Sequence, residues 1–249
     1  MIEMTNISLQ FTGKTLLDNV SLKIEKGTTH VILGPSGAGK STILKVILGL
    51  FQIDDGNIVI DGKDIASLTE TEVLKIRRKM GVVFQGNALF DSLTVAENTA
   101  YFLSDFTNDS KQQIDNKVKE VLSFVNLEGT ENLYPDQLSG GMKKRLAIAR
   151  ALATDPKIIL FDEPTTGLDP INSKTILELI KRLKTKGTTS VIVTHILNDA
   201  ILIGDVLTVI NDGRIVTSGS IDKILQSHNQ FIKDFFYEVY NGLSLIEQS

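Results

Sequence analysis

The segment GPSGAGKS, residues 34–41, combines glycines, a lysine and a hydroxyl side chain at the spacing G-x-x-x-x-G-K-[ST]. Glycines let backbone N–H groups converge on phosphate oxygens, and a helix that follows them adds the partial positive charge of its N-terminus. Lys40 is then predicted to reach the β- and γ-phosphates, and Ser41 to offer its hydroxyl to Mg²⁺. The alternative is a glycine turn that binds nothing. The predicted phosphate site comprises Gly34, Pro35, Ser36, Gly37, Ala38, Gly39, Lys40, Ser41 and Thr42.

The segment KIILFDEP ends an apolar run in two acidic residues, Asp162 and Glu163. Adjacent strand residues point to opposite faces, so we expect the two carboxylates to have different roles. Asp162 suits the coordination shell of Mg²⁺, and Glu163 can orient an attacking water and accept its proton. Phosphoryl transfer asks a protein mainly for positioning and charge, which these residues can supply. The alternative is a strand that ends in solvated acids.

The segment LSGGMKKRLAIAR contains a second glycine-rich helix start. Ser139 is a favourable N-cap, and Gly140 and Gly141 leave the first helical N–H groups open to an anion. The helix after them has one apolar face, made of Met142, Leu146, Ala149 and Ala153. A helix terminus contributes only about 0.3–2 kcal/mol toward a charge, so it would supplement a phosphate that a P-loop already holds. Taken alone, the segment is better interpreted as a flexible glycine turn before a helix.

The elements that must position these residues follow an α/β pattern. THVILG is a continuous apolar run, typical of a strand covered on both faces, and it leads directly into the first glycine loop. Further short β-branched runs alternate with helical segments, which predicts a parallel sheet covered by helices. These runs are KMGVVFQ, KIILFDE, TTSVIVTH and DVLTVI.

Between Gly86 and Asp155 no such run is present, which indicates a helical insertion in the α/β core. Thr94 and Glu97 have the spacing of a capping box, and residues 111–127 form a polar helical run. Near the N-terminus, apolar residues alternate with mostly polar ones, as in half-buried strands. These apolar residues are Ile7, Leu9, Phe11, Val20, Leu22 and Ile24. The segment NDGRI predicts a hairpin turn near the end of the chain.

Composition narrows the choice of function. The chain has 249 residues, of which 42% are hydrophobic, so it can bury a large core. Its net charge of −4, with basic residues spread along the chain, gives no sign of a nucleic-acid partner. The chain has 0 cysteines, which excludes disulfides and thiolate metal sites. We recognise neither a secretory signal nor a membrane-spanning segment, and expect a soluble chain whose membrane role, if any, comes through a partner.

The motifs together resemble the ATPase subunit of ABC transporters. GPSGAGKST, Gln85 at the end of a strand, LSGGM shortly before ILFDEP, then GLDP and VTH agree in order and spacing over residues 1–225. The resemblance implies a P-loop NTPase (RecA-like) core with an N-terminal antiparallel β subdomain and an inserted α-helical subdomain. It places the ATPase domain at residues 1–225, the helical subdomain at 86–154 and a C-terminal helical tail at 226–249.

The resemblance also assigns roles to residues that are uninformative alone. It implies a head-to-tail homodimer in which Ser139, Gly140 and Gly141 of one chain contact the γ-phosphate of ATP held by the other. Gln85 would sense Mg²⁺ and water and link to the membrane subunit, and His195 would contact the γ-phosphate. Asp169 would couple the two sites across the dimer, although it would otherwise be an N-cap. Phe11 would stack on adenine, the alternative being plain core packing.

Two residues depart from the family pattern. Ile196 follows the switch histidine where an aspartate is usual, and Met142 replaces the usual glutamine of the signature. Because we infer that Ser139 and backbone N–H groups make the phosphate contacts, we expect Met142 to preserve them. A signature reading SGGM followed by basic residues, together with ALFDSLTVAEN, is similar to the Mla/Mce-type lipid-transport branch.

The resemblance therefore implies an enzyme that hydrolyses ATP with Mg²⁺ and drives permease subunits, whose cargo would be phospholipid or another hydrophobic substrate. It implies a position on the cytoplasmic face of the inner (cell) membrane, held peripherally through the permease, and a lipid-binding Mce-like protein as a further partner. The alternatives are an importer of polar solutes such as amino acids, an assembly ATPase such as one for iron–sulfur clusters, and a nucleotide-binding module without turnover.

The tail places Phe231, Phe235 and Val239 on one helical face. We expect either a helix that packs on the chain's own core or a clasp onto the second ATPase chain.

Overall fold

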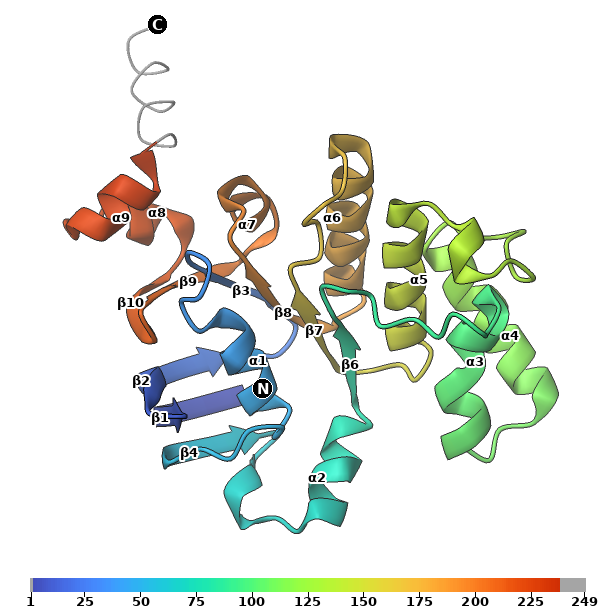
Figure 1. The fold of residues 1–249 in the computed structure, drawn as a ribbon, viewed down its shortest axis with the longest axis horizontal. Coiled ribbons are helices and arrows are strands. Elements are labelled where there is room, and N and C mark those ends of the chain that lie inside the picture. Colours follow the sequence, from blue (N-terminus) through green and yellow to red (C-terminus); the bar gives the residue numbers. More distant parts are fainter. Residues whose placement is uncertain (1, 238–249) are drawn as a thin grey trace, which may run out of the picture.

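A computed structural model describes residues 2–237 and contains two β-sheets with a helix between them (Figure 1). The larger sheet has six strands in the order β10-β9-β3-β8-β7-β6. All neighbouring strands in it are parallel except β10, which pairs antiparallel with β9. The strands are β3 (Thr29–Leu33), β6 (Met80–Val83), β7 (Ile158–Asp162), β8 (Thr189–Thr194), β9 (Val206–Asn211) and β10 (Arg214–Gly219). This confirms the predicted parallel sheet.

The smaller sheet is antiparallel and contains the predicted N-terminal strands in the order β2-β1-β4-β5. Its strands are β1 (Ile2–Phe11), β2 (Lys14–Ile24), β4 (Asp55–Ile60) and β5 (Lys63–Asp64). The helix α1 (Lys40–Ile47) lies between the sheets, and its buried Ile43 and Ile47 belong to the hydrophobic cluster that joins them. The residue pattern did not reveal β4 or β5, which are short and polar at their starts.

The helices α5 (Gly140–Leu152), α6 (Pro170–Thr185) and α7 (Leu197–Ile203) cover the opposite face of the large sheet, and one hydrophobic cluster joins them to it. The helices α3 (Val95–Phe106) and α4 (Lys111–Phe124) pack on the far side of α5 and belong to the same cluster. The helix α2 (Glu70–Arg77) and two short 3-10 helices, Ile65–Ser67 and Pro135–Gln137, complete the connections. Within the described residues 86–155 there is no strand, as predicted, and Thr94 and Glu97 form the expected capping box.

The last described elements, α8 (Ile221–Leu225) and α9 (Gln230–Phe235), pack on the main core. Ile232 and Phe236 are fully buried in it, and the rings of Phe231 and Phe235 stack with their centroids 5.6 Å apart. For residues up to 237 this packing favours the chain's own core as the partner of the tail. Val239, on the predicted face, lies outside the described residues.

The predicted hairpin joins β9 to β10 through Asp212 and Gly213, both with positive φ angles. None of the helices within residues 2–237 combines the length and the apolar character that crossing a membrane requires.

Candidate nucleotide site

The first glycine loop connects the buried strand β3 to α1, the position in which backbone N–H groups can receive phosphate. Gly39 caps α1 with a φ of +104°, and no side chain bonds to the helix start. A Cβ atom at Gly39 would lie 2.9 Å from the carbonyl oxygen of Leu16, and one at Gly34 would lie 2.2 Å from that of Ile210. Both positions therefore require glycine, and the N–H groups of the first helical turn stay open to an anion.

Lys40 is buried at the first position of α1. Its Nζ donates to the carbonyl oxygens of Gly34 and Pro35, each at 2.9 Å, and lies 3.7 Å from Glu163 Oε1. Burial lowers the pKa of Lys40, and the charge of Glu163 offsets part of this effect. The loop thus holds a positive charge beneath itself, as a site for a polyphosphate requires.

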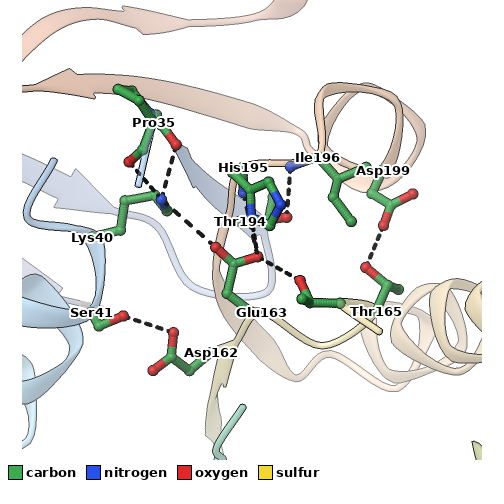
Figure 2. A network of polar contacts seen from close by, with 12 residues as sticks. Pro35, Lys40, Ser41, Asp162, Glu163, Thr165, Thr194, His195, Ile196 and Asp199 are labelled. Carbon is green, nitrogen blue, oxygen red and sulfur yellow. Dashed lines mark hydrogen bonds and ion pairs between the residues drawn. The ribbon is translucent and has the colours of Figure 1, made fainter. Parts of the chain in front are cut away.

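Asp162 ends β7 and faces the same loop (Figure 2). The hydroxyl of Ser41 donates to Asp162 Oδ1 at 2.9 Å, so a hydroxyl oxygen and a carboxylate lie side by side. Residues 2–237 contain no group of three or more His, Cys, Asp or Glu side chains arranged to hold a metal. This donor set fits Mg²⁺, which is usually held by one or two protein oxygens and completed by substrate phosphate and water.

Glu163 lies immediately beyond the end of β7, with a φ of +49° that is uncommon for a residue other than glycine. The sequence suggested that alternation along a strand separates Asp162 from Glu163. The structure shows instead that the strand ends at Asp162 and that the turn at Glu163 separates the two side chains. The side chain of Glu163 is only 9% exposed. Its Oε2 accepts a hydrogen bond from Thr166 Oγ1 at 3.0 Å and lies 2.9 Å from His195 Nδ1.

The glycine loop, Lys40, Ser41 and Glu163 line one pocket of about 500 Å³, together with His195 and Gln85. Its walls come from β2, the glycine loop, α1 and the segments that follow β6, β7 and β8. Gln85 lies two residues beyond the end of β6, slightly past the strand end that the sequence predicted. The fold thus brings the carboxyl ends of three parallel strands to the nucleotide loop, which is where open α/β sheets bind ligands.

The position after His195 is occupied by Ile196, which begins α7 without a side-chain cap. Its backbone N–H donates instead to Thr194 Oγ1 at 3.0 Å. One turn later, Asp199 accepts a hydrogen bond from Thr165, so α7 is fastened to the segment that carries Glu163 (Figure 2). The hydrogen bonds around Ile196 thus involve its own N–H, Thr194 and Asp199, and His195 contacts Glu163.

A protein-family model described as "ABC transporter" matches residues 17–166. The chain belongs to the ABC transporter ATP-binding family. It is 39% identical over 238 residues to the intermembrane phospholipid transport system ATP-binding protein MlaF of Haemophilus influenzae, covering 94% of this chain and 90% of that protein. It is 40% identical to the methionine import ATP-binding protein MetN of Haemophilus ducreyi, covering 95% and 72% respectively.

Among solved structures, the chain resembles the dimeric ATP-binding cassette MJ0796 in a post-hydrolysis state bound to ADP and Pi. The TM-score is 0.80 at 36% identity, over 89% of this chain and 99% of that one. The chain is therefore an ABC ATPase with the P-loop NTPase fold, and the resemblance read from its motifs is confirmed.

The signature of this ABC ATPase begins α5, outside the pocket-lining residues. Ser139 is the N-cap, as predicted, and its Oγ accepts from the N–H of Met142 at 3.3 Å. That N–H is therefore engaged within its own helix in the single chain, and the phosphate contacts of the signature stay predictions. The Met142 side chain is half-buried and packs on the core with Leu146, so the predicted apolar face is present.

The structure does not test the predicted roles of two residues, Asp169 and Phe11. Asp169 is the N-cap of α6 and accepts hydrogen bonds from the N–H groups of Ile171 and Asn172, each at 3.0 Å. Phe11 is 59% exposed and lies outside the pocket-lining residues, with its ring centroid 6.3 Å from that of Phe51. Coupling by Asp169 and adenine stacking by Phe11 stay predictions.

The sequence motifs did not indicate two contacts that α5 makes. Gly141 packs so closely on α6 that a Cβ atom there would lie 2.1 Å from Asn172 Oδ1. Lys144 is 2% exposed, and its Nζ donates to the carbonyl oxygens of Phe84 and Gln85. A lysine in a polar helical run is normally solvated, so only the three-dimensional packing shows that this one is buried.

Proposed function

We propose that this ABC ATPase powers a membrane permease that moves phospholipid or another hydrophobic substrate. The similarity to MlaF over most of both chains is the observation that carries this proposal. The signature LSGGM and the segment ALFDSLTVAEN, similar to the lipid-transport branch, support it from the residues themselves. The ATPase would lie on the cytoplasmic face of the inner membrane, attached through the permease.

In the proposed reaction, the N–H groups of the glycine loop and the ammonium of Lys40 bind the phosphates of ATP. Ser41 and Asp162 would hold Mg²⁺, with Gln85 beside them, and the ion when bound neutralises charge on the phosphate oxygens. Glu163 would orient the attacking water and accept its proton. Its contact with His195 supports this role, because the hydrogen bond fixes the carboxylate on the pocket side.

We infer that the active form is a head-to-tail homodimer in which 139–141 of one chain complete the site of the other. The glycine loop has a lysine and two carboxylates around it, whereas the start of α5 lies apart from that pocket. Beside it, Ile171 at the start of α6 is 79% exposed, which suits an apolar contact with a second copy. The dimeric form of the related cassette MJ0796 supports the same arrangement.

We place the permease contact at the cleft between the sheet edge and the helical insertion, which Ala88, three residues after Gln85, helps to line. This cleft has a volume of about 300 Å³ and combines basic with aromatic side chains. Its walls include Arg77, Arg78, Phe90, Tyr101 and Arg150. Such a lining suits a permease segment with an apolar face and an acidic residue. Residues 86–154 would then act as the helical subdomain of a domain that spans 1–225.

Import of a polar solute is the second candidate, because the chain is as similar to MetN as to MlaF. The two candidates predict different cargo for the same ATPase.

Purification of the chain with its native membrane partners separates them. We expect a permease and an Mce-like lipid-binding protein to co-purify, and the reconstituted complex to hydrolyse ATP and transfer labelled phospholipid between vesicles. Methionine uptake by the same vesicles without lipid transfer would instead establish the importer. A complex carrying Glu163→Gln serves as the control for ATP-driven movement.

A further inference from the structure

Lys144 lies one turn into α5, on the side that faces the loop containing Gln85. Its ammonium is buried, and its acceptors are backbone carbonyl oxygens, Gln85 O at 2.9 Å and Phe84 O at 3.3 Å. Burial lowers the pKa of Lys144, and the charge of Asp162 offsets part of this effect. Burying an ammonium group costs free energy that two carbonyl contacts recover only in part, so the position requires an explanation beyond stability.

The contact at Lys144 is one of three between α5 and the segment 81–88. At the other end of the helix, a Cβ atom at Gly81 would lie 2.7 Å from the carbonyl oxygen of Ala151, so β6 and α5 are in direct backbone contact. Beyond Gln85, the guanidinium of Arg150 donates to Ala88 O at 2.6 Å and to Asn87 O at 3.2 Å.

The backbone of the Gln85 loop depends on these contacts. Asn87 and Ala88 have φ angles of +63° and +51°, a conformation that residues other than glycine adopt at a cost of about 1–3 kcal/mol unless the surroundings enforce it. Arg150 binds the carbonyl groups of these same two residues. The contacts from α5 therefore add to the loop's own turn, in which the N–H of Asn87 donates to Phe84 O at 3.0 Å.

The helix that is held to this loop also carries the signature at its N-terminus. Gly140 is its first residue and Lys144 follows one turn later, so a displacement of the signature moves the Lys144 ammonium with it. We propose that Lys144 is a positioning residue that transmits the position of the signature helix to Gln85, and so adjusts one chain's nucleotide pocket when its signature engages the other chain. This inference rests on the proposed roles of Gln85 and of the homodimer.

The proposed contact connects two different nucleotide pockets of the dimer. Gln85 lines the pocket of its own chain, whereas the signature is proposed to complete the pocket of the other. Lys144 would therefore connect the two pockets of a dimer through one rigid helix, independently of Asp169.

A double-mutant cycle on the full chain tests the proposal. Lys144→Met keeps the length and apolar stem of the side chain and removes only the ammonium group. We expect kcat for ATP to fall about tenfold and KM to change by less than about twofold, because binding to the glycine loop is untouched while Gln85 is released. Lys143→Met, one position earlier, where the half-buried lysine makes no hydrogen bond to Phe84 or Gln85, should leave both parameters unchanged.

The same substitution is then introduced into a Gln85→Ala chain. If Lys144 acts through Gln85, it has no further effect on kcat there, since the residue it positions is gone. Multiplicative losses, or an unchanged kcat in Lys144→Met, would overturn the link alone. An unchanged kcat in Gln85→Ala would instead overturn the proposed role of Gln85, and the inference with it.

A thermal melt keeps this test separate from folding. Lys144→Met removes the cost of burying a charge but also the donor to Phe84 O and Gln85 O, so we expect the midpoint of unfolding to change little. If Lys144→Met nevertheless fails to fold, the cycle is run with Lys144→Gln, whose amide can still donate one hydrogen bond to the loop. The expected pattern is the same with a smaller loss of kcat, and multiplicative losses again overturn the link.

Discussion

The helices α1 and α5 both start in glycine-rich segments, and they differ in what surrounds their first turn. At α1 the glycine loop lines one pocket with a buried lysine, Glu163 and His195, and no side chain caps the helix. Asp162 bonds to Ser41 in the first turn of the same helix. At α5 the helix is capped by its own Ser139, and a Cβ atom at Gly140 would meet nothing closer than Leu168 at 4.0 Å. The first start is a site formed by its own chain, whereas the second is an open surface at which we propose that a second chain binds.

The largest effect on ATPase activity should come from changing Glu163, which lines the pocket at the start of α1. Glu163→Gln preserves the shape of the side chain but cannot accept the proton of water, so we expect turnover to fall about 10²–10⁴-fold while ATP still binds and promotes dimerisation. Phosphate release and gel filtration with ATP measure the two effects. The exposed Glu178→Gln on α6 is the matched control. Unchanged turnover in Glu163→Gln would show that the pocket at α1 does not contain the catalytic base, and the contrast with the start of α5 would fail.

The next effect concerns the charge beneath the glycine loop. Lys40→Ala removes the ammonium group that neutralises phosphate, so ATPase activity should fall about 10²-fold or more and nucleotide affinity should fall with it. Lys45→Ala, an exposed position on the same helix, controls for loss of a lysine from α1. Titration with a fluorescent ATP analogue measures affinity. Wild-type activity in Lys40→Ala would contradict the assignment of this loop as the phosphate site.

A smaller effect distinguishes the two glycines at the second start. Gly141→Ala places a methyl group against Asn172, so we expect the free energy of unfolding to fall by about 1–3 kcal/mol. Gly140→Ala enters open space and should change it by less than about 0.5 kcal/mol. Chemical denaturation checks both values. The added change Asn172→Ala should recover part of the loss in Gly141→Ala, because it removes the clashing Oδ1 but also the contacts of this side chain with Arg145 and Asp169. Equal losses of unfolding free energy in the two variants would show that both glycines are needed for their backbone conformation. The close approach of α5 and α6 would then not explain the requirement at Gly141.

The smallest effect is expected at Met142. Its N–H already bonds Ser139 and its side chain packs on the core, so Met142→Gln should change ATPase activity by less than about tenfold, or 1.4 kcal/mol. A steady-state ATPase assay of the two chains is sufficient. A greater loss would show that the methionine side chain takes part in completing the site.

The sequence predicted the elements that repeat a simple physical pattern. The buried strand β3, the parallel neighbours that follow it and the glycine loop are encoded in short apolar runs next to turn residues, so they could be located without the structure. Lys40, Asp162 and Glu163 follow from that arrangement. The strands β4 and β5 could not be located in the same way, because their first residues are exposed and polar.

The contacts that join distant segments were beyond the sequence. Lys144 and Gln85 are 59 residues apart, and nothing in KKRLAIAR distinguishes the lysine that is buried from the neighbour that is not. The turn at Glu163 could not be predicted from the sequence either, because a run such as KIILFDE predicts an extended backbone up to its last residue. Both features depend on packing between elements, which residue periodicity does not report.

The left-handed backbone at Glu163 restricts how this enzyme can be altered in the laboratory or by mutation over generations. Asparagine and aspartate tolerate that conformation, whereas β-branched residues are strained in it, so a valine would combine a chemical loss with a folding defect. Glycine would relax the backbone while deleting the carboxylate. Inactive versions intended to capture ATP are therefore best made with an isostere, because other replacements also change how well the chain holds its own shape.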